Sequence, residues 1–327
     1  MRKISKILIM LLISVMLVAC SGGTSTDGGD KKETVKVGIA IYKYDDNFMT
    51  VYRNQLSEIF KSKNTDKVEY ELIFQDGKGD PAEQANQIDA FISQGVNLIM
   101  ANLVDPTQAG TVIEKAKSAD IPLVFINREP PVDDMKVWEG KTSYVGADAR
   151  QSGTFQGEII RDLANKGDIN GDGQVSYVMI VGDPGNVDAQ YRTEFSVKAL
   201  TDAGIKVEKL LEQRGDWEQT KGQEIAASAL SQFGDKVEVI FANNDGMALG
   251  ALQAIDAAGR KVGEDIYIVG VDALDEVVTL VESGGITGTV LNDAAGQAGK
   301  AIEVSLKLLA GETVESHYWV DYVKVVK

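Results

Sequence analysis

The stretch that decides the fold is VKVGIAIYKYDDNF, residues 35–48. Its first part, Val35–Tyr42, is an apolar run rich in β-branched residues, which predicts a buried β-strand. The octapeptide IYKYDDNF, residues 41–48, then turns polar, with carboxylates and an amide among exposed aromatic residues. Carboxylates can accept paired hydrogen bonds from a polyhydroxyl ligand, and an aromatic face can cover its C–H surface. The same residues also suit a solvated turn in which Asp46 or Asn47 caps a helix, so recurrence of the pattern must decide.

Strand-like and helix-like segments alternate along almost the whole chain. The predicted strands are 35–42, 70–75, 98–103, 123–127, 143–146, 175–181, 207–211, 237–242, 266–271 and 287–291, and helical segments include 81–94, 107–118, 149–163, 224–232 and 273–282. This alternation predicts an α/β fold with parallel sheets covered by helices on both faces. The chain is longer than one hydrophobic core normally supports, so we predict two lobes. A composition shift at residues 128–141 places the boundary near 121–145, and we assign 34–121 plus 293–327 to the N-terminal lobe and 122–292 to the C-terminal lobe.

Polar residues recur where the predicted strands end. These loops contain Asn102 and Asp105, Asn127 and Arg128, Asp183 through Arg192, Arg214 and Trp217, Asn243 through Asp245, Asp272, and Asn292 with Asp293. In open α/β sheets, ligands bind outside the carboxyl ends of the strands. Each loop alone has a local explanation, such as Asp105 capping a helix that starts at Pro106. Their repetition in both halves predicts a ligand cleft between the lobes.

The residue types favour binding over catalysis. The chain has no nucleophile elbow and no Walker loop, and its single histidine, His317, lies in a terminal strand-like run where we expect a surface role. Paired carboxylates could hydrolyse glycosides, which keeps a sugar-processing enzyme as the rival class. However, the acids are interleaved with amides and Arg192, which together match vicinal sugar hydroxyls. Because these residue types suit hydroxyl recognition, we expect binding without turnover and a protein that is not an enzyme. The net charge of −16 disfavours nucleic acid and anionic ligands.

The N-terminus has the features of an export signal. Residues 1–20 combine a basic start with an apolar run too short for a membrane helix, and they end in Leu-Val-Ala-Cys. This ending resembles a bacterial lipobox, which predicts lipidation of Cys20, a flexible tether over 21–33 and an extracytoplasmic protein anchored to the cell membrane by its lipid. An ordinary signal peptide with an incidental cysteine is the alternative. Because Cys20 is the only cysteine, the fold must rest on its core without a disulfide.

A second motif, DINGDGQVS at residues 168–176, predicts a calcium site. It places oxygen ligands at positions 1, 3 and 5, glycine at position 6 and an apolar residue at position 8, as in an EF-hand loop. Position 12 is Met179, which cannot supply the bidentate carboxylate, so an acid from elsewhere must complete the shell. An Asx-turn loop without an ion is the alternative. Since the loop leads into a strand, we expect a structural ion.

The chain resembles the galactose/glucose-binding proteins of bacterial sugar ABC importers, in the ribose-binding and LacI-like periplasmic-binding superfamily. The resemblance covers essentially all of the chain after the signal. Its motifs are IYKYDDNF at 41–48, NLVDP at 102–106, AGTVIEKA at 109–116, the calcium loop, ANND at 242–245, GVDAL at 270–274 and GTVLNDA at 288–294. It implies a type I periplasmic-binding-protein fold, in which two Rossmann-like lobes with parallel sheets are joined by a hinge. A LacI-like repressor is disfavoured by the export signal and by the lack of an N-terminal helix-turn-helix.

The resemblance also implies roles for individual residues. Phe48 and Trp217 would stack on a pyranose, with Tyr42 at the cleft edge, and the polar contacts would be Asp46, Asn102, Asn186, Asp188, Arg192, Asn244, Asp272 and Asn292. Asp46 corresponds to the acceptor of the 4-hydroxyl of both epimers, which implies D-galactose and D-glucose as ligands. Ca²⁺ would be bound by Asp168, Asn170, Asp172, the Gln174 carbonyl and Ser176, with Glu238 as the remote carboxylate. The implied partner of this monomer is an ABC permease, with a chemoreceptor as a second candidate.

Three departures from the family pattern qualify these expectations. Asn186 occupies the position of a family histidine, which leaves ribose, xylose or another monosaccharide as alternatives. Ser176 replaces a glutamine in the calcium loop, which predicts a weaker site. The chain ends at Lys327, before a further crossing strand of the family, which predicts that one hinge strand is affected.

Overall fold

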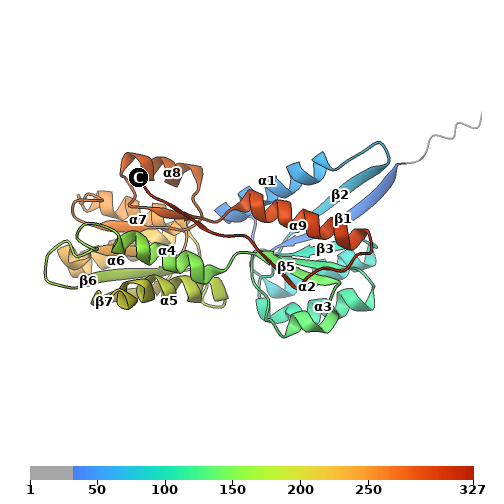
Figure 1. Cartoon of the computed structure of the whole chain (residues 1–327), viewed down its shortest axis with the longest axis horizontal. Helices are drawn as coiled ribbons and strands as arrows, with labels where there is room; N and C mark the ends of the chain where they lie inside the picture. Colours follow the sequence, from blue (N-terminus) through green and yellow to red (C-terminus); the bar gives the residue numbers. More distant parts are fainter. Residues whose placement is uncertain (1–31) are drawn as a thin grey trace, which may run out of the picture.

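Two lobes, each built on its own parallel sheet, lie end to end in the computed structural model, which describes residues 32–327 (Figure 1). Cys20, the export signal and nearly all of the predicted tether lie outside the described residues. The expected α/β class with helices on both faces of parallel sheets is confirmed. Within residues 32–327, no helix is both long and apolar enough to cross a membrane.

The first lobe contains a six-stranded sheet in the order β11-β5-β4-β3-β1-β2, in which every neighbouring pair is parallel. Its strands are β1 (Glu33–Ile41), β2 (Val68–Asp76), β3 (Leu98–Ala101), β4 (Leu123–Ile126), β5 (Thr142–Gly146) and β11 (His317–Trp319). Its helices are α1 (Asn47–Ser62), α2 (Pro81–Ser93), α3 (Ala109–Ser118) and α9 (Ala294–Leu309), with 3₁₀ turns η1 (Pro106–Gln108) and η2 (Asp134–Trp138). One hydrophobic cluster joins α1 and α9 to the sheet and another joins α2 and α3. The central strands are therefore buried on both faces, which explains their nearly continuous apolar sequences.

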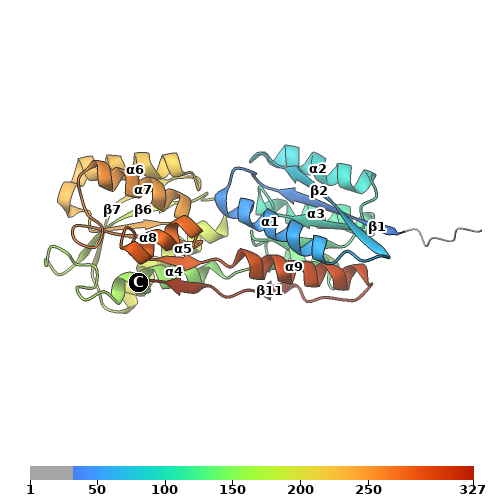
Figure 2. The same ribbon diagram turned by 90° about the horizontal axis from the view of Figure 1, so that it is seen from above.

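The second lobe has a four-stranded parallel sheet in the order β7-β6-β8-β9. Its strands are β6 (Val175–Val181), β7 (Val207–Arg214), β8 (Val239–Ala242) and β9 (Tyr267–Val269), and the antiparallel pair β10 (Thr289–Leu291) and β12 (Val323–Val325) continues beside β9 through isolated bridges. Its helices are α4 (Ala149–Arg161), α5 (Val187–Asp202), α6 (Gln219–Phe233), α7 (Asp245–Ala257) and α8 (Asp275–Ser283), with the 3₁₀ turn η3 (Gly234–Lys236). Figure 2 shows α6 and α7 together on one side of this lobe and α4 on the other. The predicted strand 175–181 coincides with β6.

The chain passes between the lobes at residues 147–148, 292–293 and 320–322. The predicted boundary at 121/122 is wrong, because β4 pairs with β3 and β5 pairs with β4 inside the first sheet. The assignment of 293–327 to one lobe is also wrong in part, since β12 pairs with β10 in the second lobe. Residues 320–322 form a crossing of their own, between β11 of the first lobe and β12 of the second.

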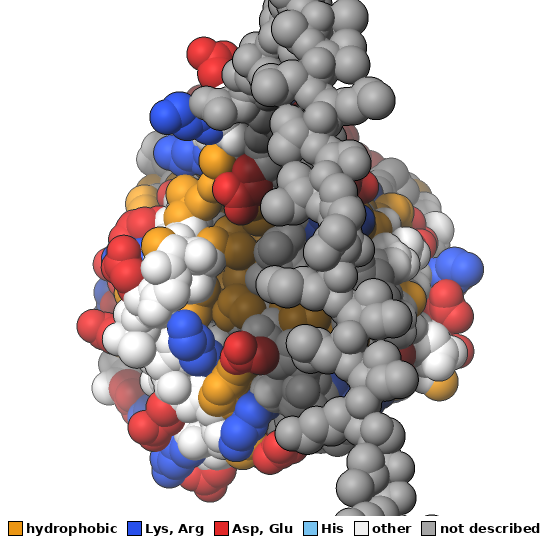
Figure 3. All heavy atoms as spheres, turned by 90° about the vertical axis from the view of Figure 1, so that its right-hand side faces the viewer, with side chains coloured by type: hydrophobic (Ala, Val, Ile, Leu, Met, Phe, Trp, Pro, Cys, Tyr) orange, Lys and Arg blue, Asp and Glu red, His pale blue; other side chains and the backbone are white. Residues whose placement is uncertain are grey.

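The end of the first lobe shows a mixed surface (Figure 3). Lys and Arg side chains alternate there with Asp and Glu around a strip of hydrophobic side chains. The net charge of −16 is therefore not gathered into a single acidic field on the visible part of this face.

Candidate ligand-binding cleft

A small cavity of about 30 Å³ lies between the lobes, where the carboxyl ends of β1, β4, β6, β8 and β10 meet. It is lined by Tyr42, Asp46, Phe48, Met49, Asn127, Arg128, Asn186, Asp188, Arg192, Trp217, Asn244, Asp272 and Asn292. The strand-end loops of both halves therefore meet in one place, as their repetition in the sequence predicts.

All the predicted sugar-contacting residues except Asn102 line this cavity. Asn102 is fully buried behind it, where its Oδ1 accepts a hydrogen bond from the Tyr42 main-chain N–H at 3.3 Å. Its Nδ2 donates to the Asn127 Oδ1 at 3.1 Å. Asn102 therefore orients two cavity residues and is not itself part of the wall.

Three lining residues were not carried over from the family resemblance. Asn127 and Arg128 do belong to a polar strand-end loop of the sequence, so the recurrence of such loops could have identified them. Met49 carries no such signal, because it lies within α1 and is a normal core residue by type.

The first-lobe wall is held by bonds within the protein. The Tyr42 hydroxyl donates to the Asp46 Oδ2 at 2.6 Å, and the Met49 main-chain N–H donates to the Asp46 Oδ1 at 2.7 Å. The second bond makes Asp46 the N-cap of α1, so both interpretations of the octapeptide, helix cap and cavity wall, apply together. Burial and the nearby Asp46 raise the pKa of Tyr42 well above its usual value, which keeps the hydroxyl protonated. Phe48 is only 6% exposed and packs against Tyr52, with ring centroids 6.0 Å apart.

The second-lobe wall contains polar atoms without protein partners. Among the described residues, the Asp188 Oδ1, the Arg192 Nε and the Trp217 Nε1 are buried and make no hydrogen bond. Burial raises the pKa of Asp188 to about 6, although Arg192 and Arg128 act in the opposite direction. Buried polar groups are normally satisfied, so an acceptor and two donors around one cavity indicate a polar ligand or water.

Glycines bring the second-lobe helices close enough to support this wall. A Cβ on Gly153 of α4 would lie 2.8 Å from the Tyr191 carbonyl, and one on Gly157 would lie 2.2 Å from the Ser196 carbonyl. Only glycine permits this approach, which places α5 and its Arg192 against α4. Similarly, a Cβ on Gly182 would lie 2.3 Å from the Trp217 indole, so the indole rests directly on the backbone after β6.

Several loops at the cavity hold strained backbone. Asp216 and Trp217 have φ of 52° and 68°, and Asp272 and Ala273 have φ of 125° and 54°. Non-glycine residues rarely adopt positive φ, and such strain is concentrated at functional sites. The Asp272 carboxylate also accepts from the Asn292 Nδ2 at 3.2 Å. Burial raises the pKa of Asp272 well above its usual value, and the positive charge of Arg192 acts in the opposite direction.

Asp245, directly after the ANN of 242–244, supports the strained loop from behind. It is fully buried, and its carboxylate accepts from the Leu274 main-chain N–H at 2.9 Å and from the Thr289 hydroxyl at 2.7 Å. Asn244 has a separate structural task, because its Oδ1 caps α7 by accepting from the Met247 main-chain N–H at 3.0 Å. These bonds fix the positions from which Asn244 and Asp272 face the cavity.

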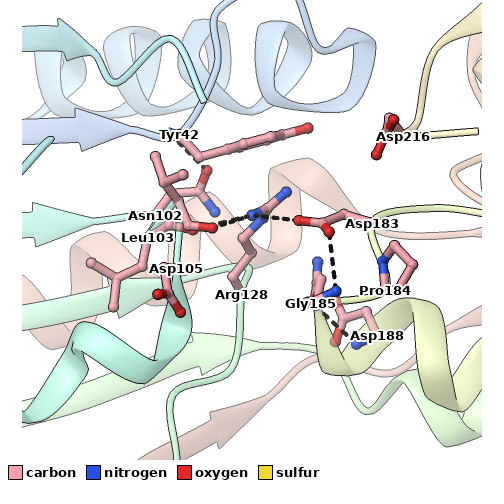
Figure 4. A network of polar contacts seen from close by, with 12 residues as sticks. Tyr42, Asn102, Leu103, Asp105, Arg128, Asp183, Pro184, Gly185, Asp188 and Asp216 are labelled. Atoms are coloured by element: carbon pink, nitrogen blue, oxygen red, sulfur yellow. Dashed lines mark hydrogen bonds and ion pairs between the residues drawn. The ribbon is translucent and has the colours of Figure 1, made fainter. Parts of the chain in front are cut away.

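Charged side chains connect the lobes at the cleft. Arg128 of the first lobe stacks on the Tyr42 ring, with 3.6 Å from the guanidinium carbon to the ring centroid, and donates to the Val104 carbonyl at 2.9 Å. The same guanidinium lies 3.9 Å from the Asp183 carboxylate of the second lobe (Figure 4). A second pair, Lys43 and Glu218, spans the lobes at 3.3 Å.

The predicted calcium loop surrounds a buried carboxylate. Glu238 is 1% exposed, and it accepts from the main-chain N–H groups of Ile169 at 2.7 Å and Ser176 at 2.8 Å. Asp168 accepts from the N–H groups of Gly171 and Gly173, at 2.7 and 3.0 Å. Two Asx-turns follow in the loop, since Asn170 accepts from the Asp172 N–H at 2.8 Å and Asp172 accepts from the Gln174 N–H at 3.0 Å.

The donor chemistry of the loop suits calcium only if neutral oxygens take part. Within residues 32–327, no three Asp, Glu, His or Cys side chains form a group arranged for a metal ion. The expected set also draws on the Asn170 amide and the Gln174 carbonyl, which are hard oxygen donors of the kind that Ca²⁺ accepts. The Ser176 hydroxyl donates to the Glu208 carboxylate at 3.3 Å, outside the predicted ligand set. The loop therefore fits a calcium ion in donor type and in the proximity of Glu238.

Comparison with known proteins places these features in a family context. The family model described as "Periplasmic binding protein domain" matches residues 37–313. A D-galactose/methyl-galactoside binding periplasmic protein of Haemophilus influenzae is 38% identical, over 89% of this chain and 87% of the relative. The ribose import binding protein of Escherichia coli is 28% identical, over 81% of this chain and 83% of the relative.

Solved structures agree with the fold. An ABC transporter solute-binding protein from Bacillus halodurans, solved with bound myo-inositol, matches with a TM-score of 0.77 and 27% identity, over 92% of this chain and 96% of that one. A galactofuranose-binding protein matches with a TM-score of 0.79 at 23% identity, over 89% and 94% of the two chains, and supports the fold alone.

Proposed function

The chain belongs to the periplasmic binding protein family, and we propose that it captures a neutral monosaccharide between its lobes and delivers it to an ABC importer. The observation that carries this proposal is the interlobe cavity, whose second-lobe wall has the unpaired Asp188 Oδ1, Arg192 Nε and Trp217 Nε1. A carboxylate accepts from a hydroxyl and a guanidinium donates to one, so a polyol satisfies both without adding net charge.

The difference between the two walls suggests the order of the steps in ligand binding. The sugar first meets the prepared wall, where Asp46 accepts a hydroxyl and Phe48 covers a ring face. Rotation of the lobes about the crossings then brings Asp188, Arg192 and Trp217 to the remaining hydroxyls and the opposite face. Closure excludes water and strengthens every polar contact inside, and the closed form is the one that docks on the permease.

We propose D-galactose and D-glucose as the ligands. The proposal is supported by Asp46 at the cavity and by the galactoside-binding relative at 38% identity. The ribose-binding relative keeps other monosaccharides as the alternative, and Asn186 is the lining residue on which the choice depends, because it replaces a family histidine. Its Oδ1 already accepts from the Asp188 N–H at 3.0 Å, which leaves its amide NH₂ for the sugar.

The cellular setting is proposed on sequence grounds alone. Lipidated Cys20 would anchor a monomer outside the cell membrane, near the permease of a sugar importer, with a chemoreceptor as a second candidate partner. A sugar-processing enzyme is not supported by any additional observation in the cavity.

Asp46→Ala tests the proposal. We expect calorimetry to show loss of galactose and glucose binding, because a partly buried acceptor disappears from the wall. Since the change also removes the cap of α1, at a cost of about 1 kcal/mol, Asp46→Asn serves as a second variant that retains the cap. Asp45→Ala is the matched control, as its side chain is 73% exposed and lies outside the cavity lining. Unchanged affinity in both Asp46 variants would refute the assignment.

We further propose that Ca²⁺ occupies the loop 168–176, bound by Asp168, Asn170, Asp172, the Gln174 carbonyl and Glu238. Ser176 would be a weaker ligand than the glutamine that it replaces. The ion would tie the loop to β8 through Glu238 and so stabilise the second lobe. Binding to the native state alone raises stability, so removing the ion with EDTA should lower the melting temperature. Glu238→Gln should abolish this difference. An identical melt with and without chelator, on protein shown to contain Ca²⁺, would count against the site.

A further inference from the structure

Tyr322 lies in the crossing 320–322, where it contacts α4 through Gln151 and α5 through Arg192. It is 4% exposed, and its main-chain N–H donates to the Gln151 Oε1 at 2.7 Å. Gln151 is in the first turn of α4, directly after the crossing at 147–148. Tyr322 therefore ties two of the lobe crossings together on the side of the second lobe.

The Tyr322 hydroxyl also contacts an arginine of the cavity wall. The Arg192 Nη2 donates to the Tyr322 Oη at 3.0 Å, and the Arg192 Nη1 donates to the Asn243 carbonyl at 2.8 Å. The guanidinium carbon lies 5.8 Å from the centroid of Trp217 and 5.9 Å from that of Tyr322. Two bonds and two rings thus fix the plane of the guanidinium.

These contacts leave the Nε–H of Arg192 without a partner in the protein. The Nε is buried, and the residue lines the cavity. A guanidinium is planar, so the direction of the Nε–H is set by the anchoring of the two terminal nitrogens. If the Tyr322 anchor is absent, the plane can rotate about the remaining bond to Asn243.

We propose that Tyr322 is a positioning residue, which holds the Arg192 guanidinium so that its Nε–H meets a ligand hydroxyl. In this way it couples the hinge to the cavity. This inference rests on the proposed function, because it requires a polyol in the cavity. Tyr322 itself is absent from the cavity lining, so its effect must pass through Arg192.

Tyr322→Phe is the direct test, because it keeps the ring and removes only the hydroxyl. We expect calorimetry to show about tenfold weaker binding of galactose or glucose, as for the loss of one hydrogen bond to a charged group. Tyr318→Phe is the matched control. It also removes a hydroxyl that accepts one hydrogen bond, from the Glu315 N–H at 3.1 Å, but in the first lobe and away from the cavity. Its affinity should equal that of the unaltered protein.

A panel of deoxy sugars separates positioning from general support. Arg192→Lys identifies the hydroxyl that Arg192 contacts, since the penalty for deleting that hydroxyl shrinks in this variant. Tyr322→Phe should reduce the penalty at the same hydroxyl and leave the others unchanged. A uniform loss across the panel, or unchanged affinity, would overturn the inference while the proposed function stands. If the unaltered protein binds none of galactose, glucose, xylose, ribose and myo-inositol, both are overturned.

Discussion

The two walls of the cleft carry similar residues but differ in how many of their polar side-chain atoms have hydrogen-bond partners within the protein. In the first lobe, both oxygens of Asp46 have protein partners, the Tyr42 hydroxyl and the Met49 N–H. In the second lobe, Asp188 is buried with an oxygen that has no partner, and its pKa is raised to about 6 by burial. The first wall is therefore preformed, while the second is completed only when a ligand supplies the missing bonds.

This difference should lower the stability of the second lobe relative to the first. An ionised carboxylate without a partner in a buried position destabilises the folded protein, whereas one that caps a helix stabilises it. Most of the positive φ values at the cavity, those of Asp216, Trp217, Asp272 and Ala273, also belong to the second lobe, whereas the first-lobe wall has one, at Asn127 with φ of 63°. The second lobe is therefore less stable than it would be without its ligand-binding residues, whereas the capping by Asp46 stabilises the first lobe.

The largest expected effect is the loss of binding in Asp188→Asn. Replacing a buried carboxylate that accepts a sugar hydroxyl should weaken galactose binding by about 3 kcal/mol, roughly a hundredfold. The same change should raise the free energy of unfolding of the ligand-free protein at pH 7 by about 2 kcal/mol, because it removes the buried charge. Asp46→Asn should weaken binding without any such gain. Equal stability changes in the two variants would break the comparison between the walls.

The stabilising effect of Asp188→Asn should depend on pH. The folded-state pKa of about 6 lies above the ordinary value of 3.8, so ionisation of Asp188 lowers stability as the pH rises through this interval. Below about pH 4 the carboxyl is protonated in both states, and the advantage of the variant should disappear. Denaturant unfolding of both proteins at pH 7, 5 and 4 checks this, and a constant difference would contradict it.

A smaller effect is expected from Gly182→Ala. The added Cβ would lie 2.3 Å from the Trp217 indole, so the ring must move away from its place in the cavity wall. We expect galactose affinity to fall about tenfold through the loss of stacking and of the Nε1 donor. Gly185→Ala is the control in the same loop, since its Cβ would meet nothing closer than the Asp183 carboxylate at 3.4 Å. Similar losses in both variants would indicate a general disturbance of the loop.

The smallest effect concerns the contact between the lobes. Asp183→Asn removes the charge facing Arg128, at 3.9 Å, but can keep the bond to the Gly185 N–H. A partly exposed ion pair contributes about 0.5–1 kcal/mol, so affinity should fall two- to fivefold and become less sensitive to salt. Glu212→Gln, which faces Lys209 on the surface of the second lobe, should change neither. An unchanged salt dependence in Asp183→Asn would mean that this contact does not contribute to closure.

Local patterns predicted most elements because strands and helices carry their own periodicity. Each predicted strand overlaps an observed one, and only the ends differ by a few residues. The helix expected over 107–118 is divided into η1 and α3, since Pro106 and the Asp105 cap start a tight turn first. The alternatives for Asp46 were not exclusive, because one carboxylate oxygen can cap a helix while the group faces a cavity.

The errors in the prediction concern relations between distant segments. Asn102 has the residue type and the strand-end position of a ligand contact, but its distances to Tyr42 and Asn127 place it behind the wall. The lobe boundary was misplaced because parallel strands pair through nonlocal hydrogen bonds, which leave no mark in the local pattern. The same holds for Tyr322, whose contact with Arg192 joins residues far apart in the chain.

The sequence by itself determined the α/β class and the polar strand ends of the two halves, because these follow from short-range periodicity and residue chemistry. The resemblance to a known family then pointed to nearly all the individual cavity residues. Only the tertiary structure decided which strands share a sheet, where the chain crosses between lobes, and which buried polar atoms remain without partners. Those features depend on packing between segments that are distant in sequence, and the unpaired Asp188 and the Tyr322–Arg192 contact exist only once both lobes and the hinge are assembled.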